Sequence, residues 1–289
     1  MKICALTMVY RDYWAISQWY THYARHLGPE NLFIIAHGQD DKFAELCPKA
    51  NVIVAPRDDL TGFDQRRGQM LNAIQSELGE IYEWVIRTDA DELICVDPAR
   101  FGSLAEMFGS TTAPAVFGLG LNLVELECDT ISESAEPVLR THANAVFSGH
   151  YSKAFAVCDE TPLVRHGVKV SPPDAPKFPF ELPCGVYLVH LKFANQTALA
   201  EGNRHRMKMA SGPGKGLPGH AWRHADKVAK KFLSETATKP IRDWDSAVND
   251  AYGQIGREPS AAFLGGGLIK AHSLTFPFRT ILPDWFKTA

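Results

Sequence analysis

The sequence predicts an α/β protein, a single domain with a mainly parallel central sheet, a mixed second half and C-terminal helices. Three observations support this class. Short apolar runs alternate with helical patterns over residues 3–96, later apolar runs follow one another with little helix between them, and helical patterns return after residue 195. Strands interleaved with helices favour right-handed βαβ units and a mainly parallel sheet. A chain of 289 residues is long enough to bury a sizeable core.

In the first half, four apolar runs predict strands and the segments between them predict helices. The strands are expected at residues 3–9, 31–36, 51–55 and 83–88. Residues 14–27 place apolar side chains at helical spacing, and Gly28 with Pro29 ends that helix. Asp64 is expected to cap a second helix, whose apolar positions are Met70, Leu71, Ile74 and Leu78.

The second half predicts more strand and less helix, followed by helices near the C-terminus. Strands are expected at residues 116–126, 143–147, 153–157, 163–170 and 186–193. Helices are expected at 196–209 and 222–233, joined by segment 211–219, which is too rich in Gly and Pro for regular structure. The aromatic tail 274–286 is expected to pack on the body, with contact to a membrane surface or a lipid-linked acceptor as the alternative.

Composition and charge exclude several classes of protein. Basic residues number 30 and acidic residues 33, and this net charge of −3 argues against a dedicated nucleic-acid binder. The six cysteines lack zinc-ribbon spacing, and most are expected to be buried thiols, which suits a reducing compartment. The apolar N-terminal stretch is too short for a signal peptide, and the best stretch elsewhere falls short of the ~20 residues that span a bilayer. We expect a cytoplasmic protein, at most peripheral to the inner face of the membrane.

An acidic turn follows the fourth predicted strand. Asp89, Asp91 and Glu92 place three carboxylates within four residues at the carboxyl end of residues 83–88, where open α/β sheets bind ligands. Crowded carboxylates repel one another unless a cation lies among them, and hard oxygen ligands suit Mg²⁺ or Mn²⁺. The alternative is an acidic helix N-terminus, but residues 93–96 have the pattern of a strand.

A histidine in the last predicted strand is a second candidate metal ligand. Strand alternation places His190 on one face with Leu188 and Lys192, and a neutral imidazole can complete the coordination of a divalent ion. The alternative for His190 is a strand-end histidine bonded to a backbone carbonyl. His166 is the rival ligand, and His150 is a weaker one.

The order of these motifs resembles the glycosyltransferase family 2-like group, which has the GT-A fold and a DxD motif. The Asp-x-Asp-Glu sequence at residues 89–92 carries the resemblance, together with a Gln/Arg-containing helix at 65–72, a strand with Lys at 152–154 and an apolar-Val-His strand at 188–190. The first helix agrees through the residues Trp19, Tyr20, His22, Tyr23, Leu27 and Gly28. The chain departs from the group at Arg11-Asp12, where an Asn-Glu pair is usual.

The resemblance implies a metal-dependent glycosyltransferase that uses a nucleotide-sugar donor, with a UDP-sugar as the first expectation, and a glycan or lipid-linked acceptor. Residues 1–195 would be the GT-A catalytic core, with a nucleotide-binding half at 1–110 and an acceptor half at 111–195, and 196–289 a helical extension. Asp91 would ligate Mn²⁺ or Mg²⁺ with His190, and Asp89 would face the metal, the ribose or the diphosphate. Asp40 or Asp41 would reach the nucleobase or ribose, with a helix N-cap as the alternative.

Basic residues are candidates for stabilising the departing diphosphate. Arg204 and Arg206 are expected to stabilise this diphosphate, with Lys208 beside them. Loop 211–219 is expected to close over the donor as a lid. The alternative is that these basic residues form a solvated helix face. Lys153 is expected to touch the acceptor or a phosphate, or else to be an exposed strand end. Arg66, with its neighbour Arg67, points at the donor or forms a helix salt bridge.

The catalytic base is the least determined part of the site. An inverting transferase needs a carboxylate that accepts the proton of the attacking hydroxyl, and Asp174, held in a proline-rich loop, is the first candidate. A retaining mechanism would need no such base. The other candidates are Asp159, Glu160, Glu181, Glu125 and Glu127.

Two other functions remain open at this point. One is a sugar nucleotidyltransferase, a class that usually carries a Gly-rich N-terminal loop with a lysine, which residues 7–12 lack. The other is a non-catalytic module that binds a nucleotide or glycan.

Overall fold

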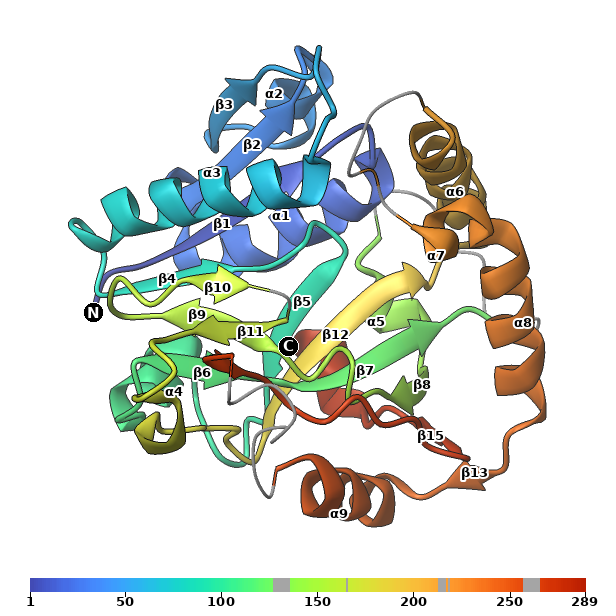
Figure 1. Cartoon of the computed structure of the whole chain (residues 1–289). Helices are drawn as coiled ribbons and strands as arrows, with labels where there is room; N and C mark the ends of the chain where they lie inside the picture. Colours follow the sequence, from blue (N-terminus) through green and yellow to red (C-terminus); the bar gives the residue numbers. More distant parts are fainter. Residues whose placement is uncertain (127–135, 165, 213–216, 218, 257–265) are drawn as a thin grey trace.

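The computed structural model describes residues 1–126, 136–164, 166–212, 217, 219–256 and 266–289. Within these residues it has two six-stranded sheets and one three-stranded sheet, with helices packed around them (Figure 1). The expected α/β class, with a Rossmann-like parallel sheet and a mixed second half, is confirmed. No helix in these described ranges has both the length and the apolar character that crossing a membrane requires.

The first sheet has the order β3-β2-β1-β4-β9-β6. Its first four members are parallel, as the alternating pattern predicts: β1 (Ile3–Val9), β2 (Leu32–His37), β3 (Asn51–Ala55) and β4 (Trp84–Arg87). The strand β9 (Ala154–Val157) is antiparallel to both of its neighbours, β4 and β6 (Ala115–Phe117). The carboxyl ends of β1 to β4 therefore lie at one edge.

The second sheet has the order β13-β15-β8-β7-β12-β5. Its members are β5 (Glu92–Val96), β7 (Leu119–Val124), β8 (Asn144–Phe147), β12 (Val186–Phe193), β13 (Ile241–Arg242) and β15 (Arg279–Ile281). A small third sheet joins β10 (Leu163–Val164), β11 (Gly167–Lys169) and β14 (Leu268–Ile269). Residues 196–289 thus contribute strands to the sheets as well as helices.

Helices cover both faces of the first sheet. Those on the first sheet include α1 (Tyr13–Leu27) and α3 (Phe63–Gly79). The other helices of the described residues are α2 (Lys42–Leu46), α4 (Leu104–Ser110), α5 (Val138–Thr141), α6 (Gln196–Ala210), α7 (His220–Arg223), α8 (Ala225–Thr238) and α9 (Trp244–Ile255), with short 3₁₀ turns at Pro29–Asn31, Ala175–Lys177 and Asp284–Thr288. In β1, Ala5 packs in the cluster that contains Trp19 of α1, whereas Leu6 packs with Leu71 of α3. This period-two alternation between two buried faces explains why β1 is apolar throughout.

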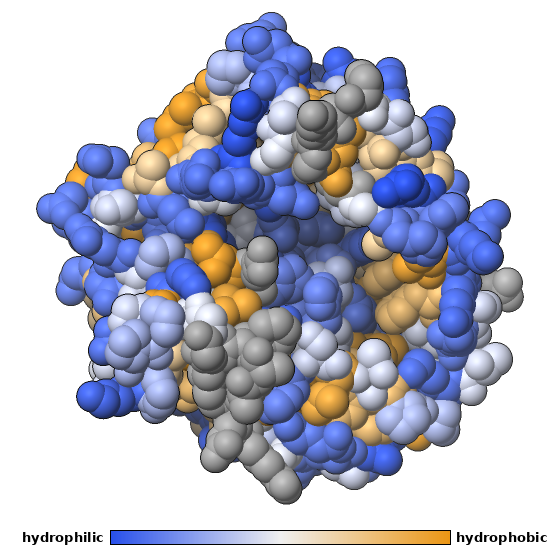
Figure 2. Space-filling view, in the orientation of Figure 1, coloured by the Kyte–Doolittle hydropathy of each residue, from blue (hydrophilic) through white to orange (hydrophobic). Residues whose placement is uncertain are grey.

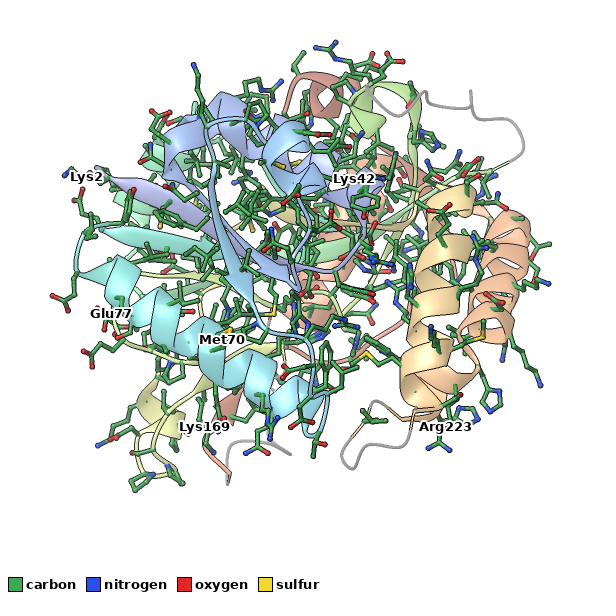
Figure 3. The ribbon with its side chains drawn as sticks, turned by 90° about the horizontal axis from the view of Figure 1, so that it is seen from above. Lys2, Lys42, Met70, Glu77, Lys169 and Arg223 are labelled. Carbon is green, nitrogen blue, oxygen red and sulfur yellow. The ribbon has the colours of Figure 1, made fainter. Side chains whose placement is uncertain are left out.

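Seen from above, α3 presents Met70 and Glu77 on its outer side, and α6 and α8 lie at the other end of the molecule (Figure 3). The exposed lysines of α8, at positions 227, 230 and 231, form its solvent face as expected. The aromatic tail packs on the body, because Phe276, Phe278 and Phe286 are buried. Contact of this tail with a membrane surface stays a prediction.

Four local expectations were wrong in detail. The helix expected at 222–233 divides into α7 and α8 at His224. Asp64 does not cap α3 but lies in its first turn, because α3 begins after Gly62, whose φ of 64° suits glycine. The strand expected at 163–170 is the hairpin β10–β11, with His166 at a φ of 68°. The strand expected at 116–126 divides at Gly118, because the chain passes there from the first sheet to the second.

Candidate active site

A cleft lies between the carboxyl ends of β1, β3 and β4 and the helix α6. Two adjoining cavities of about 930 and 490 Å³ form it, and they share Tyr10, Arg57, His205 and Met209. Figure 2 shows the surface hollowed here, with mainly hydrophilic side chains around the opening. A third cavity, of about 770 Å³, adjoins the smaller of the two at Asp89.

The acidic turn joins the two large sheets. Residues 89–91 lie between β4 of the first sheet and β5 of the second, so the alternative of an acidic helix N-terminus is wrong. The turn is fixed by its own hydrogen bonds: the Asp89 amide donates to Glu92 Oε2 at 2.9 Å, and the Leu191 amide donates to the Asp91 carbonyl at 2.7 Å.

Asp89 lies between two cations. Arg67 of α3 pairs with Oδ1, and Lys153 Nζ lies 3.1 Å from Oδ2. Burial alone would raise the pKa of Asp89, but Lys153 and Arg67 hold it well below its ordinary value. Asp89 is therefore an anion whose two oxygens are already partnered, and this arrangement favours Asp91 over Asp89 as a direct metal ligand.

Glu92 has a structural place in the turn. Its side chain is 0% exposed, and Lys153 Nζ lies 2.8 Å from Oε1. Burial raises the pKa of Glu92 to about 7 in spite of Lys153, and the negative charges of Asp89 and Asp91 act in the same direction as burial. Lys153, itself 9% exposed, thus joins two carboxylates of the turn instead of standing as an exposed strand end.

Asp91 and His190 face each other across the cleft floor. His190 Nε2 lies 3.3 Å from Asp91 Oδ2, and His190 Nδ1 lies 2.7 Å from Asn122 Oδ1. One ring nitrogen of His190 thus contacts an amide oxygen and the other a carboxylate oxygen. Burial lowers the pKa of His190 below its ordinary value despite Asp91. Burial alone would raise the pKa of Asp91, but His190 in turn lowers it, so the two side chains stabilise each other, and both are of a type that can ligate a divalent ion.

The Tyr151 ring fixes the orientation of this imidazole. It stacks on His190 at 3.7 Å between ring centres with an interplanar angle of 22°. A Cβ at Gly120 would lie only 2.2 Å from the Tyr151 carbonyl carbon, so only glycine allows this approach. The alternative that His190 bonds to a backbone carbonyl is not what the structure shows.

A divalent ion fits these residues, but as a two-ligand site. Within the described part of the chain, no group of three or more His, Cys, Asp or Glu side chains is arranged to hold a metal. Asp91 and His190 would therefore supply two ligands, with the remaining positions left to phosphate oxygens and water, which is the usual way that Mg²⁺ binds. The rival ligands His166 and His150 line the same cavity, and His166 Nδ1 lies 2.7 Å from the His150 carbonyl.

The α6 wall adds positive charge opposite the acidic turn. Arg206 lines the same cavity as Asp91 and the half-buried Asp12, and its Nη1 donates to Asn203 Oδ1 at 3.2 Å. Burial, followed by the charge of Asp91, raises the pKa of Asp12 to about 6. Asp12 also caps α1 through the Ala15 amide. A carboxylate with a raised pKa is thus present in the cleft.

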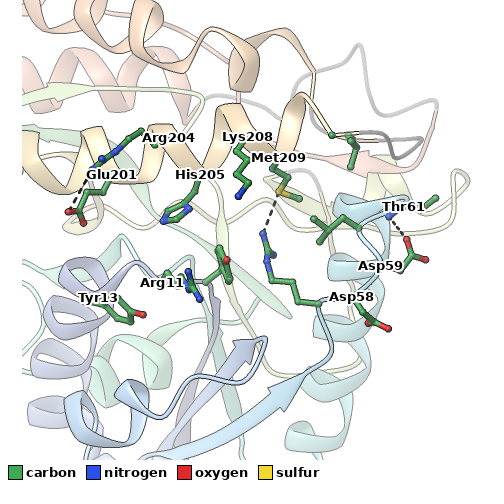
Figure 4. Close-up of a pocket in the computed structure, with 15 residues that line it drawn as sticks. Arg11, Tyr13, Asp58, Asp59, Thr61, Glu201, Arg204, His205, Lys208 and Met209 are labelled. Carbon is green, nitrogen blue, oxygen red and sulfur yellow. Dashed lines mark hydrogen bonds and ion pairs between the residues drawn. The ribbon is translucent and has the colours of Figure 1, made fainter.

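The larger cavity has an aromatic and cationic lining. The Arg57 guanidinium lies 3.6 Å from the centre of the Tyr10 ring, and Arg57 Nη1 lies 2.8 Å from His37 Nδ1. Burial and Arg57 lower the pKa of His37 to about 4, so its ring is neutral and stacks on Phe63. Figure 4 shows the α6 side chains Arg204, His205, Lys208 and Met209 facing Arg11 and Tyr13.

Several predicted residues lie elsewhere. Arg66 pairs with the exposed Asp59 at 2.5 Å, and neither Asp40 nor Asp41 lines the described cavities. Asp40 accepts from the Tyr13 hydroxyl at 2.7 Å and from the Lys42 amide at 3.2 Å, and Asp41 is at the N-cap position of α2 without a side-chain capping hydrogen bond.

The proposed base is also outside the cleft. Asp174 is exposed, accepts from the Ser171 hydroxyl and lines none of these cavities. Among its alternatives, Glu125 and Glu181 accept from backbone amides of Gln196 and Ala113, and Asp159 and Glu160 are exposed. Glu127, and residues 213–216 and 218 of the expected lid, lie outside the described residues.

Sequence reasoning missed three residues of this site. Asp12 and Arg57 directly follow the ends of β1 and β3, so the rule that selected Asp89 could also have found them. Asn122 lies inside an apolar strand, where a single amide is a weak signal, and only the pairing of β7 with β12 places it beside His190.

The comparisons with known proteins are distant. No protein-family model and no curated protein matches the chain. Among solved structures, mannose-1-phosphate geranyltransferase from Thermus thermophilus is 13% identical, with 98% of this chain and 74% of that chain covered and a TM-score of 0.32. CMP:2-keto-3-deoxy-manno-octonic acid synthetase in complex with CTP is 12% identical, with coverage of 82% and 87% and a TM-score of 0.29. TarS from S. aureus is 11% identical, with coverage of 82% and 44% and a TM-score of 0.34. Likenesses this distant carry no argument about activity.

Proposed function

We propose that the chain is a metal-dependent glycosyltransferase that moves a sugar from a nucleotide-sugar donor to a hydroxyl acceptor. The carrying observation is the contact between Asp91 Oδ2 and His190 Nε2 at 3.3 Å, with His190 Nδ1 held by Asn122. A carboxylate and an imidazole held side by side in a polar cleft offer two ligand atoms of the kinds that bind Mn²⁺ or Mg²⁺. The DxD resemblance of residues 89–92 supports the same assignment.

The donor is proposed to lie along the cleft. Its nucleoside part occupies the cavity of about 930 Å³, where Tyr10 and Arg57 offer stacking surfaces and Lys208 a positive charge. Its diphosphate lies toward Asp91 and Arg206. A bound Mn²⁺ or Mg²⁺ would neutralise part of the diphosphate charge. In this assignment residues of the 1–110 half and of α6 hold the donor.

In the reaction, the acceptor oxygen forms a bond to the anomeric carbon while the bond from that carbon to the nucleoside diphosphate breaks. The hydroxyl proton passes to a carboxylate. Asp12 lines the same cavity as Asp91 and has a pKa raised to about 6, which favours it over the exposed Asp174 for this role. Arg206 stabilises the charge that develops on the departing diphosphate. A base in this position corresponds to inversion at the anomeric carbon.

The test combines nucleotide binding with turnover. The wild-type chain is titrated calorimetrically with UDP, GDP and TDP in Mn²⁺ and in EDTA, and hydrolysis of the corresponding nucleotide sugars is followed. Asp91→Asn should remove the Mn²⁺-dependent part of the affinity and lower turnover at least 100-fold. Asp245→Asn, an exposed acid on α9, is the matched control.

Each alternative has its own outcome. Pyrophosphate-dependent formation of a nucleoside triphosphate would replace the proposal with a sugar nucleotidyltransferase. Saturable nucleotide binding without turnover of any donor would indicate a binding module. Wild-type metal dependence in Asp91→Asn would refute the site.

A further inference from the structure

We propose that the cavity of about 770 Å³ between α3 and the β10–β11 hairpin binds a saccharide that carries a phosphate or carboxylate group, with Arg87 as the residue that holds the anion. Its volume is within the range of cavities that enclose small ligands. Figure 1 shows α3 and β10 on either side of β4, whose last residue is Arg87. The identification of this saccharide as the acceptor rests on the proposed function; the binding site itself does not.

Arg87 carries a positive charge without an acidic partner. Its Nη1 donates to Asn72 Oδ1 at 2.6 Å and its Nη2 to the Leu163 carbonyl at 2.5 Å, and both acceptors are neutral. Within the described residues, no carboxylate lies within 4.0 Å of this guanidinium. A guanidinium has five N–H donors, so some remain for a ligand.

The other cations of this cavity are already paired. Arg67 pairs with Asp89, and Lys153 pairs with Asp89 and Glu92. Asp64, the remaining acid of the lining, is exposed in the first turn of α3. A charge that is partly removed from water without a counter-ion is costly, and an anion from solution would compensate it. Phosphate and carboxylate both match the planar guanidinium fork.

The α3 wall of the cavity offers amides. Gln65, Gln69 and Asn72 are spaced i, i+4 and i+7, which places them on one face of the helix, and all three line the cavity. Neither glutamine makes a side-chain hydrogen bond in the part of the chain that the structure describes. Amide groups both donate and accept, as sugar hydroxyls require. The wall therefore suits a carbohydrate better than a bare inorganic ion.

The position of this cavity suits an acceptor. Arg67, Asp89 and His166 line both this cavity and the cleft. A saccharide anchored at Arg87 would therefore lie beside the region assigned to the donor sugar. Asp89, paired with Arg67 and Lys153, lies where the two cavities meet.

The experiment measures binding in the absence of nucleotide and metal, so its result does not depend on the proposed function. The full chain in EDTA is titrated calorimetrically with glucose 6-phosphate, glucuronate, inorganic phosphate and glucose. We expect glucose 6-phosphate or glucuronate to bind at least tenfold more tightly than glucose and than inorganic phosphate. The better of the two identifies the anion.

Two variants test the residues. Arg87→Gln should weaken the binding of the preferred anionic sugar at least tenfold. Gln69→Glu adds a negative charge at an exposed position of the wall and should weaken the same binding without removing a buried group. Arg100→Gln, an exposed arginine outside the described cavities, is the matched control and should bind as wild type does.

The outcomes separate the two proposals. No heat with either anionic sugar, or unchanged affinity in both Arg87→Gln and Gln69→Glu, overturns the site. Equal binding of inorganic phosphate and glucose 6-phosphate overturns the saccharide assignment. Anionic-sugar binding that depends on Arg87, in a chain without glycosyl transfer, would refute the proposed function and leave this site standing.

Discussion

Replacing Lys153 with Met tests the charge balance of the acidic turn. Lys153 Nζ lies 2.8 Å from Glu92 Oε1 and 3.1 Å from Asp89 Oδ2, and the lysine and Glu92 side chains are 9% and 0% exposed. The substitution keeps most of the apolar stem but leaves a buried carboxylate without its cation. Breaking a buried pair in this way costs about 3–5 kcal/mol of unfolding free energy.

The measurement is urea unfolding at pH 7.5, followed by circular dichroism. The matched control is Lys231→Met, which breaks an exposed helix pair with Glu235 at 3.7 Å and should change the free energy by less than about 0.5 kcal/mol. Adding Glu92→Gln to Lys153→Met should recover at least about 1 kcal/mol, because the two sites interact directly. A cost below about 1 kcal/mol for Lys153→Met, or no recovery in the double variant, would refute this reasoning.

The same variant should show a distinctive dependence on pH. Burial already raises the pKa of Glu92 to about 7 in the native protein, and removing Lys153 raises it further. A carboxyl whose folded pKa lies above its unfolded pKa binds more protons in the folded state. Both proteins should lose stability as pH rises from about 5 to 7, and above about pH 7 the stability of Lys153→Met should keep falling where that of wild type levels off; an opposite slope would contradict the assignment.

Three further predictions follow from buried or stacked groups. Burial lowers the pKa of His22 to about 3. As pH falls below 6.5, this residue should therefore reduce the free energy of unfolding by about 1.4 kcal/mol per pH unit. His22→Gln should flatten that slope in urea titrations. Trp19→Phe removes the 2.9 Å hydrogen bond from Nε1 to Thr88 Oγ1 and should lower the free energy of unfolding by about 1–3 kcal/mol in the same assay. Combined with Thr88→Val, the loss should be smaller than the sum of the two single losses. Arg57→Gln removes the guanidinium from the Tyr10 ring, and calorimetry should show at least tenfold weaker nucleoside diphosphate binding with metal dependence retained.

The parallel half of the fold was predictable because its signals are local. Each of β1 to β4 is a short apolar run, and the carboxyl-end rule placed Asp89 and Asp91 at the right edge of the sheet. The pairing of strands from distant segments was not predictable. Asp91 meets His190 because β5 pairs with β12, which places Glu92 opposite His190 across nearly 100 residues of chain.

Two site expectations failed for identifiable reasons. The proline-rich loop around Asp174 did suggest a positioned carboxylate. That carboxylate accepts a hydrogen bond from the nearby Ser171 hydroxyl and does not line the cleft. Arg66 and Arg67 are adjacent on a helix and therefore point about 100° apart. Sequence alone could not choose between them, and the structure directs Arg67 to Asp89 and Arg66 to Asp59.

The turn at residues 89–91 is also one of the covalent links between the two six-stranded sheets. Its backbone is bonded to the second sheet through Leu191, and its Asp89 side chain pairs with Arg67 of α3 and with Lys153 beside the first sheet, so a shift of one sheet against the other would distort the very residues that would grip a ligand. We therefore expect differences in substrate preference to arise in the facing wall of the cleft, which α6 forms. We expect substitutions in the core between the two sheets to reduce catalysis more than the same number of substitutions along α6.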